Sequence, residues 1–588
     1  MVLVTVITSI CCHVSNVTNG TTPPPSISGQ ELITRDQILE IAHLYYAVEW
    51  RVDQDNVYSP GEIAGGLCAY SAEGWNTRIP YAWYGHDDIY EFLKKMMDVK
   101  GAGDIDTVTA NGVPYKSGTV GGVECSGFVG ETWKIPGQLF TSDIASSSLT
   151  TVLDWADLAS GDAVNSAGHH VRLVDSYPYD SYGDKIRVYE STTLLGLEET
   201  KGVIRRVLPD EDTADFKIGY LPVRYNKISS KPSILSVLET GLGQVEVKWL
   251  GDVGDDSTHP RSGFRLYQSP DGDHWQLVPD KDETLLRIVD QSTLVQNLQP
   301  GGLYYFRVTS VKSGAESNPS DVYPVRLSLN QEPAVLLVDG FDKWFVKPEN
   351  PSALNNGFLS AYAKALDRLG ISFETVDNLV ITRSDDPEDH FDPEDYRAII
   401  YMLGDEGEAG LSRDYSLNIL EELALARYLE NGGNLFLSGS QLCEDFTDVY
   451  ATLDNLRMND AAFYRGYLKV GSSFENARTH SIESGSGIFS GIGGFDLDDG
   501  TMNYDISAPD IIWPGQGASV CLYYAEHSAA GIQYSGIFGQ GTVAGKLVYL
   551  GFPYESIMEE KIRNDIMAAV MEYFLLYPNP RQAHTDGP

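Results

Sequence analysis

The hydrophobic pattern of this chain changes twice, near residues 229 and 333, and each change predicts a change of fold. Residues 29–228 show helical periods followed by short alternating strands, residues 229–328 show strands and turns alone, and residues 333–577 show strands alternating with helices. These patterns predict an α+β domain, an all-β sandwich and a doubly wound α/β domain, in that order. With 588 residues the chain is also too long for one hydrophobic core, so a multidomain protein is expected.

Charge and the first residues restrict the partners and the location. The chain carries a net charge of -41 and would repel nucleic acids, so we exclude nucleic acid as a partner. Residues 1–12 are apolar and precede a proline-rich stretch ending near Ser28, which resembles the end of a secretory signal peptide. We therefore assign residues 1–28 to a signal-like segment and linker, and residues 578–588 to a tail. A secreted or cell-envelope protein without a membrane-spanning segment is expected.

Six cysteines are too few for a disulfide scaffold. They are Cys11, Cys12, Cys68, Cys125, Cys443 and Cys521. Cys443 and Cys521 fall in the same predicted domain, and a disulfide between them stays open. A bridge between Cys68 and Cys125 also stays open, although it would remove Cys125 from any chemistry.

Residues 121–133 carry the strongest chemical signal. A glycine-rich loop leads to Cys125, and Phe128, Val129 and Trp133 follow at the spacing of one apolar helical face. A cysteine in the first turn of a helix lies at its positive end, which favours the nucleophilic thiolate. The alternative is a buried structural cysteine, because cysteine is among the most buried residue types.

A cysteine nucleophile needs a base and a group that orients the base. His170 begins a strand over 170–175 and shares a face with Arg172, while Val171 belongs to the opposite face. His170 is therefore the predicted base, and His169 is the weaker candidate. Glu190 lies near the end of the next strand, 185–191, where its carboxylate is expected to orient the imidazole. The alternative for Glu190 is a solvated carboxylate at a strand end.

Four motifs in this order resemble the NlpC-type cell-wall cysteine peptidases, which have a papain-like fold. They are the box Pro80-Tyr-Ala-Trp-Tyr-Gly, then Glu124-Cys-Ser-Gly-Phe-Val, then Gly161-Asp-Ala-Val ahead of Gly-His-His-Val-Arg-Leu-Val, and finally Val188-Tyr-Glu. The resemblance implies a Cys125–His170–Glu190 triad, with Tyr81 helping to stabilise the oxyanion. It implies hydrolysis of an amide bond in peptidoglycan stem peptides or related peptides, and no metal or cofactor.

The sequence departs from the family's pattern at three positions. Tyr84 stands where the family has a glycine, Glu124 where aspartate is usual, and Arg172 where glycine is common. Arg172 shares the face of His170, so it is expected to narrow the cleft or select an acidic substrate group. The predicted substrate contacts are Arg172, Ser126 and Trp83.

The two later domains predict no catalysis. Residues 229–328 resemble a fibronectin type III domain, in which Leu298, Tyr304 and Phe306 match the tyrosine-corner strand. Residues 333–577 resemble the class I glutamine amidotransferase-like, flavodoxin-like fold, as found in secreted polysaccharide-acting proteins including xanthan lyase-like chains. Ser440 stands where the elbow nucleophile of that family is expected, so we interpret this domain as inactive.

Two other functions remain open. The first domain could keep the fold without the activity, in a non-catalytic extracellular binding protein. The other is polysaccharide processing, which only the resemblance of the two later domains suggests. The oligomeric state is not predicted.

Overall fold

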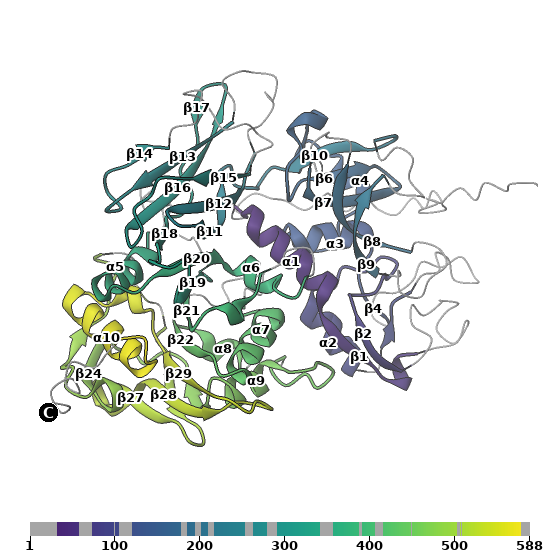
Figure 1. Ribbon diagram of the computed structural model, residues 1–588. Helices are drawn as coiled ribbons and strands as arrows, with labels where there is room; N and C mark the ends of the chain where they lie inside the picture. Colours follow the sequence, from purple (N-terminus) through teal and green to yellow (C-terminus); the bar gives the residue numbers. More distant parts are fainter. Residues whose placement is uncertain are drawn as a thin grey trace, which may run out of the picture. The chain divides into compact units, whose positions relative to one another are not determined.

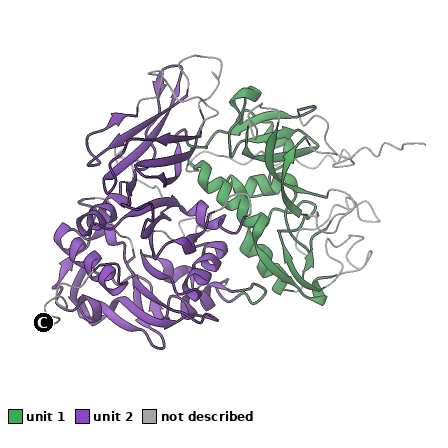
Figure 2. Ribbon diagram, viewed as in Figure 1, with its two compact units in different colours: residues 1–229, 453–457 green, residues 230–452, 458–588 purple. Residues whose placement is uncertain are grey.

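The computed structural model falls into two compact units (Figure 2): residues 1–229 with 453–457 form unit 1, and residues 230–452 with 458–588 form unit 2. The predicted signal-like segment, the predicted tail and Cys68 lie outside the described residues. These residues are 32–57, 73–98, 100–104, 120–177, 185–193, 202–209, 217–252, 263–278, 291–341, 357–386, 391–405, 415–447, 450–502, 506 and 508–577.

The helices of unit 1 confirm the predicted periods. They are α1 (Arg35–Ala47), α2 (Ile89–Met97), α3 (Cys125–Thr132) and the short α4 (Thr141–Ile144). The side chain of Gln37 accepts a hydrogen bond from the backbone N–H of Thr34 at 3.1 Å, as in a capping box at the start of α1. Asp88 caps α2 by accepting from the N–H of Glu91 at 2.7 Å. One face of α2, with Ile89, Phe92, Leu93 and Met96, is buried.

A six-stranded antiparallel sheet follows these helices (Figure 1). Its order is β5-β10-β6-β7-β8-β9. Its strands are β5 (Thr150–Val152), β6 (Ala163–Ser166), β7 (His170–Ser176), β8 (Ile186–Thr192), β9 (Gly202–Leu208) and β10 (Leu221–Tyr225). Helix α3 packs against β7 and β8, so the residue that begins α3 is held near the strands that carry His170 and Glu190.

Smaller pairs of strands complete unit 1. They are β1 (Glu49–Val52) with β2 (Gly74–Thr77), and β3 (Gly101–Ala102) with β4 (Val120–Gly121).

The first part of unit 2 consists of strands from two hydrogen-bonded groups. One group is β11 (Ser233–Gly241), β12 (Gln244–Leu250) and β15 (Ser292–Val295). The other is β13 (Gly263–Ser269), β14 (Gln276–Leu277), β16 (Leu303–Lys312), β17 (Ala315–Glu316) and β18 (Tyr323–Arg326). Trp249, Phe264 and Phe306 are buried in their common core. The Tyr304 hydroxyl accepts from the N–H of Gln299 at 2.9 Å, the hydrogen bond that a tyrosine corner makes.

The second part of unit 2 contains five parallel strands in the order β20-β19-β21-β22-β29. Numbered along the chain, this order is 2-1-3-4-5. The strands are β19 (Val335–Asp339), β20 (Phe373–Asp377), β21 (Ala398–Gly404), β22 (Asn434–Gly439) and β29 (Ala544–Leu550). Val335 and Leu337 face α5 (Leu359–Leu369) and α10 (Glu560–Tyr573), whereas Leu336 and Val338 face the side of α7 (Ile419–Glu430) and α9 (Asp460–Gly466). Helices therefore cover both faces, as continuous apolar strands require.

Antiparallel strands that the sequence pattern did not indicate extend this sheet beyond β29. They are β28 (Ala529–Ile537), β27 (Ser519–Tyr524), β24 (Ser481–Gly485) and β25 (Phe495–Asp496). Unit 2 also contains a separate pair of strands, β23 (Val470–Phe474) with β26 (Ile511–Pro514), and the short helices α6 (Asn378–Thr382) and α8 (Leu442–Asp445). The protein is thus multidomain and strongly β-rich, with some helices.

The two parts of unit 2 are joined through strand β20. It pairs with β11 at Ser236–Val376 and with β18 at Arg326–Phe373. The predicted boundary at 328–333 therefore falls inside one compact unit, and as a domain boundary it stays a prediction.

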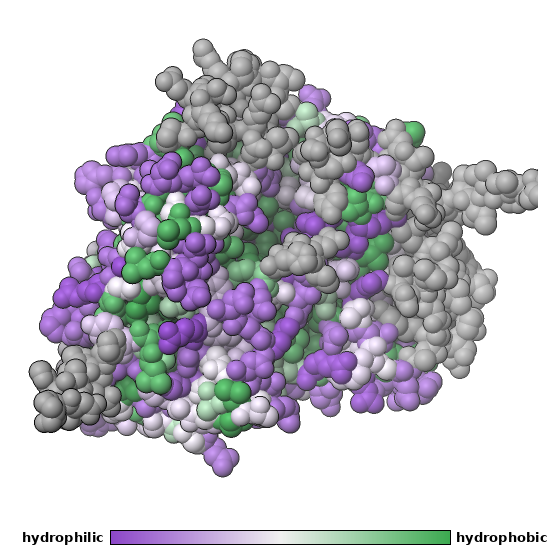
Figure 3. All heavy atoms as spheres, in the orientation of Figure 1, coloured by the Kyte–Doolittle hydropathy of each residue, from purple (hydrophilic) through white to green (hydrophobic). Residues whose placement is uncertain are grey.

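On the coloured part of the face in Figure 3, hydrophilic residues are interspersed with small patches of hydrophobic ones. Within the described ranges, no helix has both the length and the apolarity needed to cross a bilayer. Cys443 and Cys521 are both thiols, so the disulfide left open between them does not form.

Candidate functional site

The loop that leads into α3 is hydrogen-bonded along the box segment, residues 80–87. The pairs are Val123 N–H to Pro80 O at 3.0 Å, Ala82 N–H to Val123 O at 3.1 Å, Glu124 N–H to Gly85 O at 2.9 Å, and Gly122 N–H to the Asp87 carboxylate at 3.0 Å. Two motifs about forty residues apart in the sequence therefore form one backbone framework around the start of α3.

This framework depends on glycine where the backbones approach most closely. A Cβ atom at Gly127 would lie 2.0 Å from the carbonyl oxygen of Gly85. Gly122 has φ +139° and would place a Cβ 2.4 Å from the carbonyl oxygen of Pro80. No side chain fits at either position, so both glycines are needed to bring the cysteine loop against the box segment.

Cys125 is the first residue of α3, as the sequence predicts. It is a thiol, and 3% of its surface is exposed. The apolar face that follows it is also as predicted, because Phe128, Val129 and Trp133 are all buried. The helix thus points its N-terminal peptide dipoles at the cysteine, which favours a negative charge there.

Glu124, directly before the cysteine, is buried and joins the framework. Its carboxylate accepts from the Ser126 hydroxyl at 2.9 Å and from the Tyr84 N–H at 3.2 Å. Burial raises the pKa of Glu124 to about 7, against the lowering effect of these two hydrogen bonds. The Ser126 hydroxyl is thus directed to Glu124, and its role as a substrate contact stays a prediction.

The aromatic residues of the box segment form a row of neighbouring rings. Tyr84 has φ +62°, so it occupies the left-handed conformation that favours glycine. Its ring contacts Phe140, with centroids 6.0 Å apart, and Trp83, at 5.8 Å. Trp83 in turn lies 6.3 Å from the buried ring of Tyr81. The predicted roles of Tyr81 at the oxyanion and of Trp83 at the substrate stay predictions.

His170 and Glu190 meet across β7 and β8. Nε2 of His170 is hydrogen-bonded to the carboxylate of Glu190, which is 1% exposed. His169, the weaker candidate, lies in an exposed turn. Of the two alternatives for Glu190, the structure excludes the solvated carboxylate.

Two arginines also bind Glu190. Nε of Arg172 lies 3.0 Å from Oε2, and Nε of Arg206, on β9, lies 2.5 Å from Oε1. Burial alone would raise the pKa of Glu190, but the charge of Arg172, the His170 hydrogen bond and Arg206 outweigh it, so this pKa lies well below its usual range. Burial lowers the pKa of His170; Glu190 opposes this, and both arginines add to it.

The structure gives Arg172 a different setting from the one predicted. Its guanidinium pairs with Glu190 and lies over the ring of Tyr220, 4.4 Å from the centroid. It is buried, so its role as a substrate contact stays a prediction. Arg206 was missed by the sequence reasoning. The sequence offered one signal for Arg206, because this arginine lies in the strand that follows the one carrying Glu190.

In unit 2 the assignment of Ser440 to an elbow position stays a prediction. Gln441, not Ser440, has the left-handed conformation at the turn from β22 into α8, with φ +69°. Ser440 instead donates to the Asp405 carboxylate at 2.5 Å. The strained residue of a strand-to-helix elbow is the one that presents a nucleophile, and glutamine carries none.

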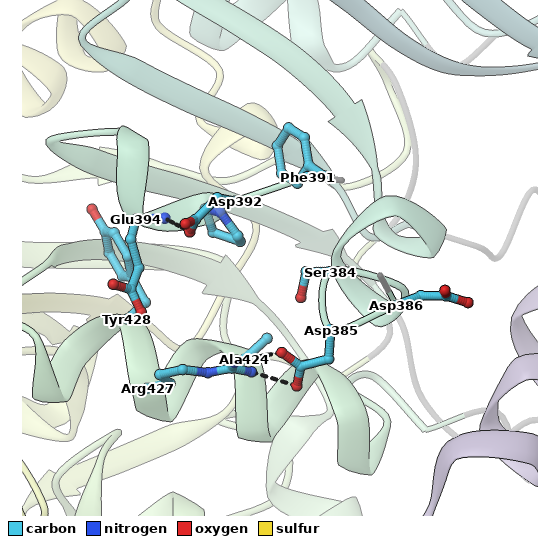
Figure 4. Close-up of a pocket in the computed structure, with 10 residues that line it drawn as sticks. Ser384, Asp385, Asp386, Phe391, Asp392, Glu394, Ala424, Arg427 and Tyr428 are labelled. Carbon is cyan, nitrogen blue, oxygen red and sulfur yellow. Dashed lines mark hydrogen bonds and ion pairs between the residues drawn. The ribbon is translucent and has the colours of Figure 1, made fainter. Parts of the chain in front are cut away.

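A cavity of about 430 Å³ in unit 2 lies beside α7 (Figure 4). Asp385 and Arg427 form a bidentate ion pair at the wall of this cavity. Asp392 caps a short helical turn by accepting a hydrogen bond from the N–H of Glu394. Among the described residues that line it there is no cysteine or histidine. In the part of the chain that the structure describes, no group of three or more His, Cys, Asp or Glu residues is arranged to hold a metal ion.

Comparison with known proteins adds little to this geometry. No family model and no curated protein matches the chain. A fibronectin type III domain from the human KIAA0970 protein is 18% identical and covers 17% of this chain and 75% of its own, with a TM-score of 0.14. The same type of domain from human fibronectin type III domain containing protein 3 is 24% identical and covers 17% and 89%, again with a TM-score of 0.14. Scores this low carry no argument about function.

Proposed function

We propose that unit 1 is a cysteine hydrolase that cleaves an amide bond in peptidoglycan stem peptides or related peptides. One observation carries the proposal: the buried His170–Glu190 pair lies on the two strands against which α3 packs, and α3 begins at Cys125. A thiol at a helix start, an imidazole and a buried carboxylate are the three groups that thiol acyl transfer needs.

The reaction would proceed in two steps. Nδ1 of His170, the ring nitrogen not turned to Glu190, takes the thiol proton as the Cys125 sulfur attacks the amide carbonyl. The imidazolium returns this proton to the leaving amine as the C–N bond breaks. Water then gives a proton to His170 as it attacks the carbonyl carbon of the acyl-enzyme, and the imidazolium returns this proton to the Cys125 sulfur as the C–S bond breaks and the acid is released. Backbone N–H groups at the start of α3, with the Tyr81 hydroxyl, would stabilise the oxyanion, at roughly 3 kcal/mol per donor.

The finer domain assignments belong to the same proposal. Unit 1 would be an NlpC-type, papain-like domain, which the predicted motif order and the hydrogen-bonded box segment support. In unit 2 the Tyr304 hydrogen bond supports a fibronectin type III domain, and the strand order 2-1-3-4-5 supports a flavodoxin-like domain. Gln441 at the elbow supports an inactive amidotransferase-like domain. The protein would act outside the cell or in its envelope.

The deciding experiment compares the wild-type protein with Cys125→Ala on purified wall peptides and intact peptidoglycan. The appearance of new amino groups with the wild type alone is the expected result. Equal release by both proteins would exclude a thiol mechanism, and unsaturated sugar ends would indicate a polysaccharide lyase instead.

A non-catalytic extracellular binding protein is the second candidate, and the burial of Cys125 favours it. Native alkylation with iodoacetamide separates the two. Burial raises the pKa of Cys443 to about 12 and raises that of Cys521 further above its ordinary value, so these thiols serve as unreactive internal controls. An activated Cys125 would be labelled much faster than both. Equal, slow labelling of all three would favour the binding protein.

A further inference from the structure

The carboxylate of Glu190 is held from both neighbouring strands. Arg172 on β7 reaches Oε2 at 3.0 Å, Arg206 on β9 reaches Oε1 at 2.5 Å, and His170 shares Oε2 with Arg172. The strand register explains this arrangement. Glu190 is paired with Ile204, so Arg206 lies diagonally across on the same face. We call Arg172 and Arg206 the arginine pair.

Two cations on one carboxylate restrict it more than either does alone. A glutamate side chain has three rotatable bonds. An ion pair to one carboxylate oxygen leaves the other oxygen able to rotate. With both oxygens bound, the carboxylate cannot rotate without breaking a charge-assisted hydrogen bond in a buried site, which costs several times more than in water.

We propose that the arginine pair positions Glu190 so that the proton of the neutral His170 ring stays on Nε2 and Nδ1 remains unprotonated. An ionised carboxylate only accepts hydrogen bonds, so an imidazole nitrogen that faces it must carry the proton. Nδ1 is then the nitrogen able to accept the thiol proton. The inference rests on the proposed function, and it assigns positioning roles that the family resemblance does not supply.

The pair also sets the charge around His170. The charged groups that act on the ring are Glu190 on β8, Arg172 on its own strand and Arg206 on β9. Burial is the main reason why the imidazolium is disfavoured and the pKa of His170 is lowered; Glu190 opposes this effect, and the two arginines add to it. The ring is therefore held neutral at neutral pH, which is the form that accepts a proton.

The test is nitrogen NMR of histidine-labelled full-length protein, with the His170 signals assigned by loss in His170→Asn. The wild type is expected to show the tautomer with the proton on Nε2. In Arg206→Gln, the ring-nitrogen shifts are expected to move toward a mixture of tautomers, and the titration midpoint is expected to move to higher pH because a nearby cation has gone. Arg206→Lys keeps the charge and is expected to keep the wild-type midpoint.

Arg205→Gln is the matched control. Arg205 is the adjacent residue of β9, but it pairs with Asp175 at 2.8 Å. A change in Arg205→Gln as large as that in Arg206→Gln, or unchanged His170 signals in a folded Arg206→Gln, would overturn the proposal. If Arg206→Gln does not fold, Arg172→Gln carries the same expectation.

The two proposals fail separately. A wild-type protein that cleaves no amide while His170 behaves as described ends the proposed function and leaves the arginine pair in place. Amide cleavage with an unaltered tautomer in the variants ends the arginine-pair proposal alone.

Discussion

The α-carbon of Gly127 approaches the carbonyl oxygen of Gly85 so closely that an added Cβ would lie 2.0 Å from it. Gly127 is in the first turn of α3, and Gly85 belongs to the box segment, so this contact sets how near the cysteine helix comes to the box. The Glu124 N–H donates to the same carbonyl oxygen at 2.9 Å. The position of Cys125 therefore depends on a backbone-to-backbone approach.

Gly127→Ala should destabilise unit 1 by at least about 2 kcal/mol, because α3 must shift away from backbone atoms that cannot move aside. The same shift should slow the alkylation of Cys125. Denaturant unfolding and iodoacetamide labelling measure the two effects. Gly130→Ala, one turn later, meets only the Leu139 side chain, at 3.3 Å, and is the control. Equal destabilisation by both variants would contradict the proposed contact.

Glu190→Gln should lower amide hydrolysis by roughly a hundred- to ten-thousand-fold, because an amide cannot stabilise the imidazolium or hold its tautomer as a carboxylate does. Steady-state rates on the best wall peptide measure this. Asp175→Asn also removes a buried, arginine-bound carboxylate from the sheet, but one that binds Arg205. Asp175→Asn should lower the free energy of unfolding, and the folded variant should keep its hydrolytic activity. A Glu190→Gln enzyme as active as Asp175→Asn would remove Glu190 from the mechanism.

Glu124 should make unit 1 less stable as the pH rises from about 4.5 to 7. Burial raises the pKa of this carboxyl from 4.5 to about 7 in the folded protein. Below pH 4.5 the Glu124 carboxyl is protonated in both the folded and the unfolded protein, and between pH 4.5 and 7 only the unfolded chain ionises. Above pH 7 the loss in free energy of unfolding stays constant, on the order of 3 kcal/mol. Glu124→Gln should remove this dependence.

Unfolding free energies of the wild type and Glu124→Gln at pH 4, 5.5, 7 and 8 measure the effect, and their difference should grow between the first and third values. Burial also raises the pKa of Glu374 to about 7, but this residue belongs to unit 2. Glu374→Gln should therefore leave the unfolding of unit 1 unchanged. A constant difference between the wild type and Glu124→Gln across this range would show that Glu124 is not shifted.

Tyr304→Phe should destabilise unit 2 by about 1 kcal/mol, because the N–H of Gln299 loses its acceptor. The neighbouring residue offers a matched control. The Tyr305 hydroxyl is buried and has no hydrogen-bond partner among the described residues. Tyr305→Phe should therefore leave stability unchanged or raise it. Urea unfolding of the two variants gives the comparison, and an equal loss in both would speak against the tyrosine corner.

Local pattern was sufficient for the elements that carry the site. The apolar spacing after Cys125 predicted α3, and period-two alternation after His170 predicted β7. The antiparallel return of the next strand then predicted that Glu190 would lie beside His170, which the hydrogen bond confirms. Arg206 escaped this reasoning because its contact depends on the register between β8 and β9, which period-two alternation alone does not specify.

By itself the sequence determined α3, β7 and β8 and the meeting of His170 with Glu190, because these follow from periodicity along a short stretch of chain. Only the tertiary structure decided that Glu190 is shared by two arginines, that Gln441 takes the left-handed conformation between β22 and α8, and that Cys125 is buried. Each of these depends on how distant backbones approach one another, and close packing sets that distance to within a fraction of an ångström.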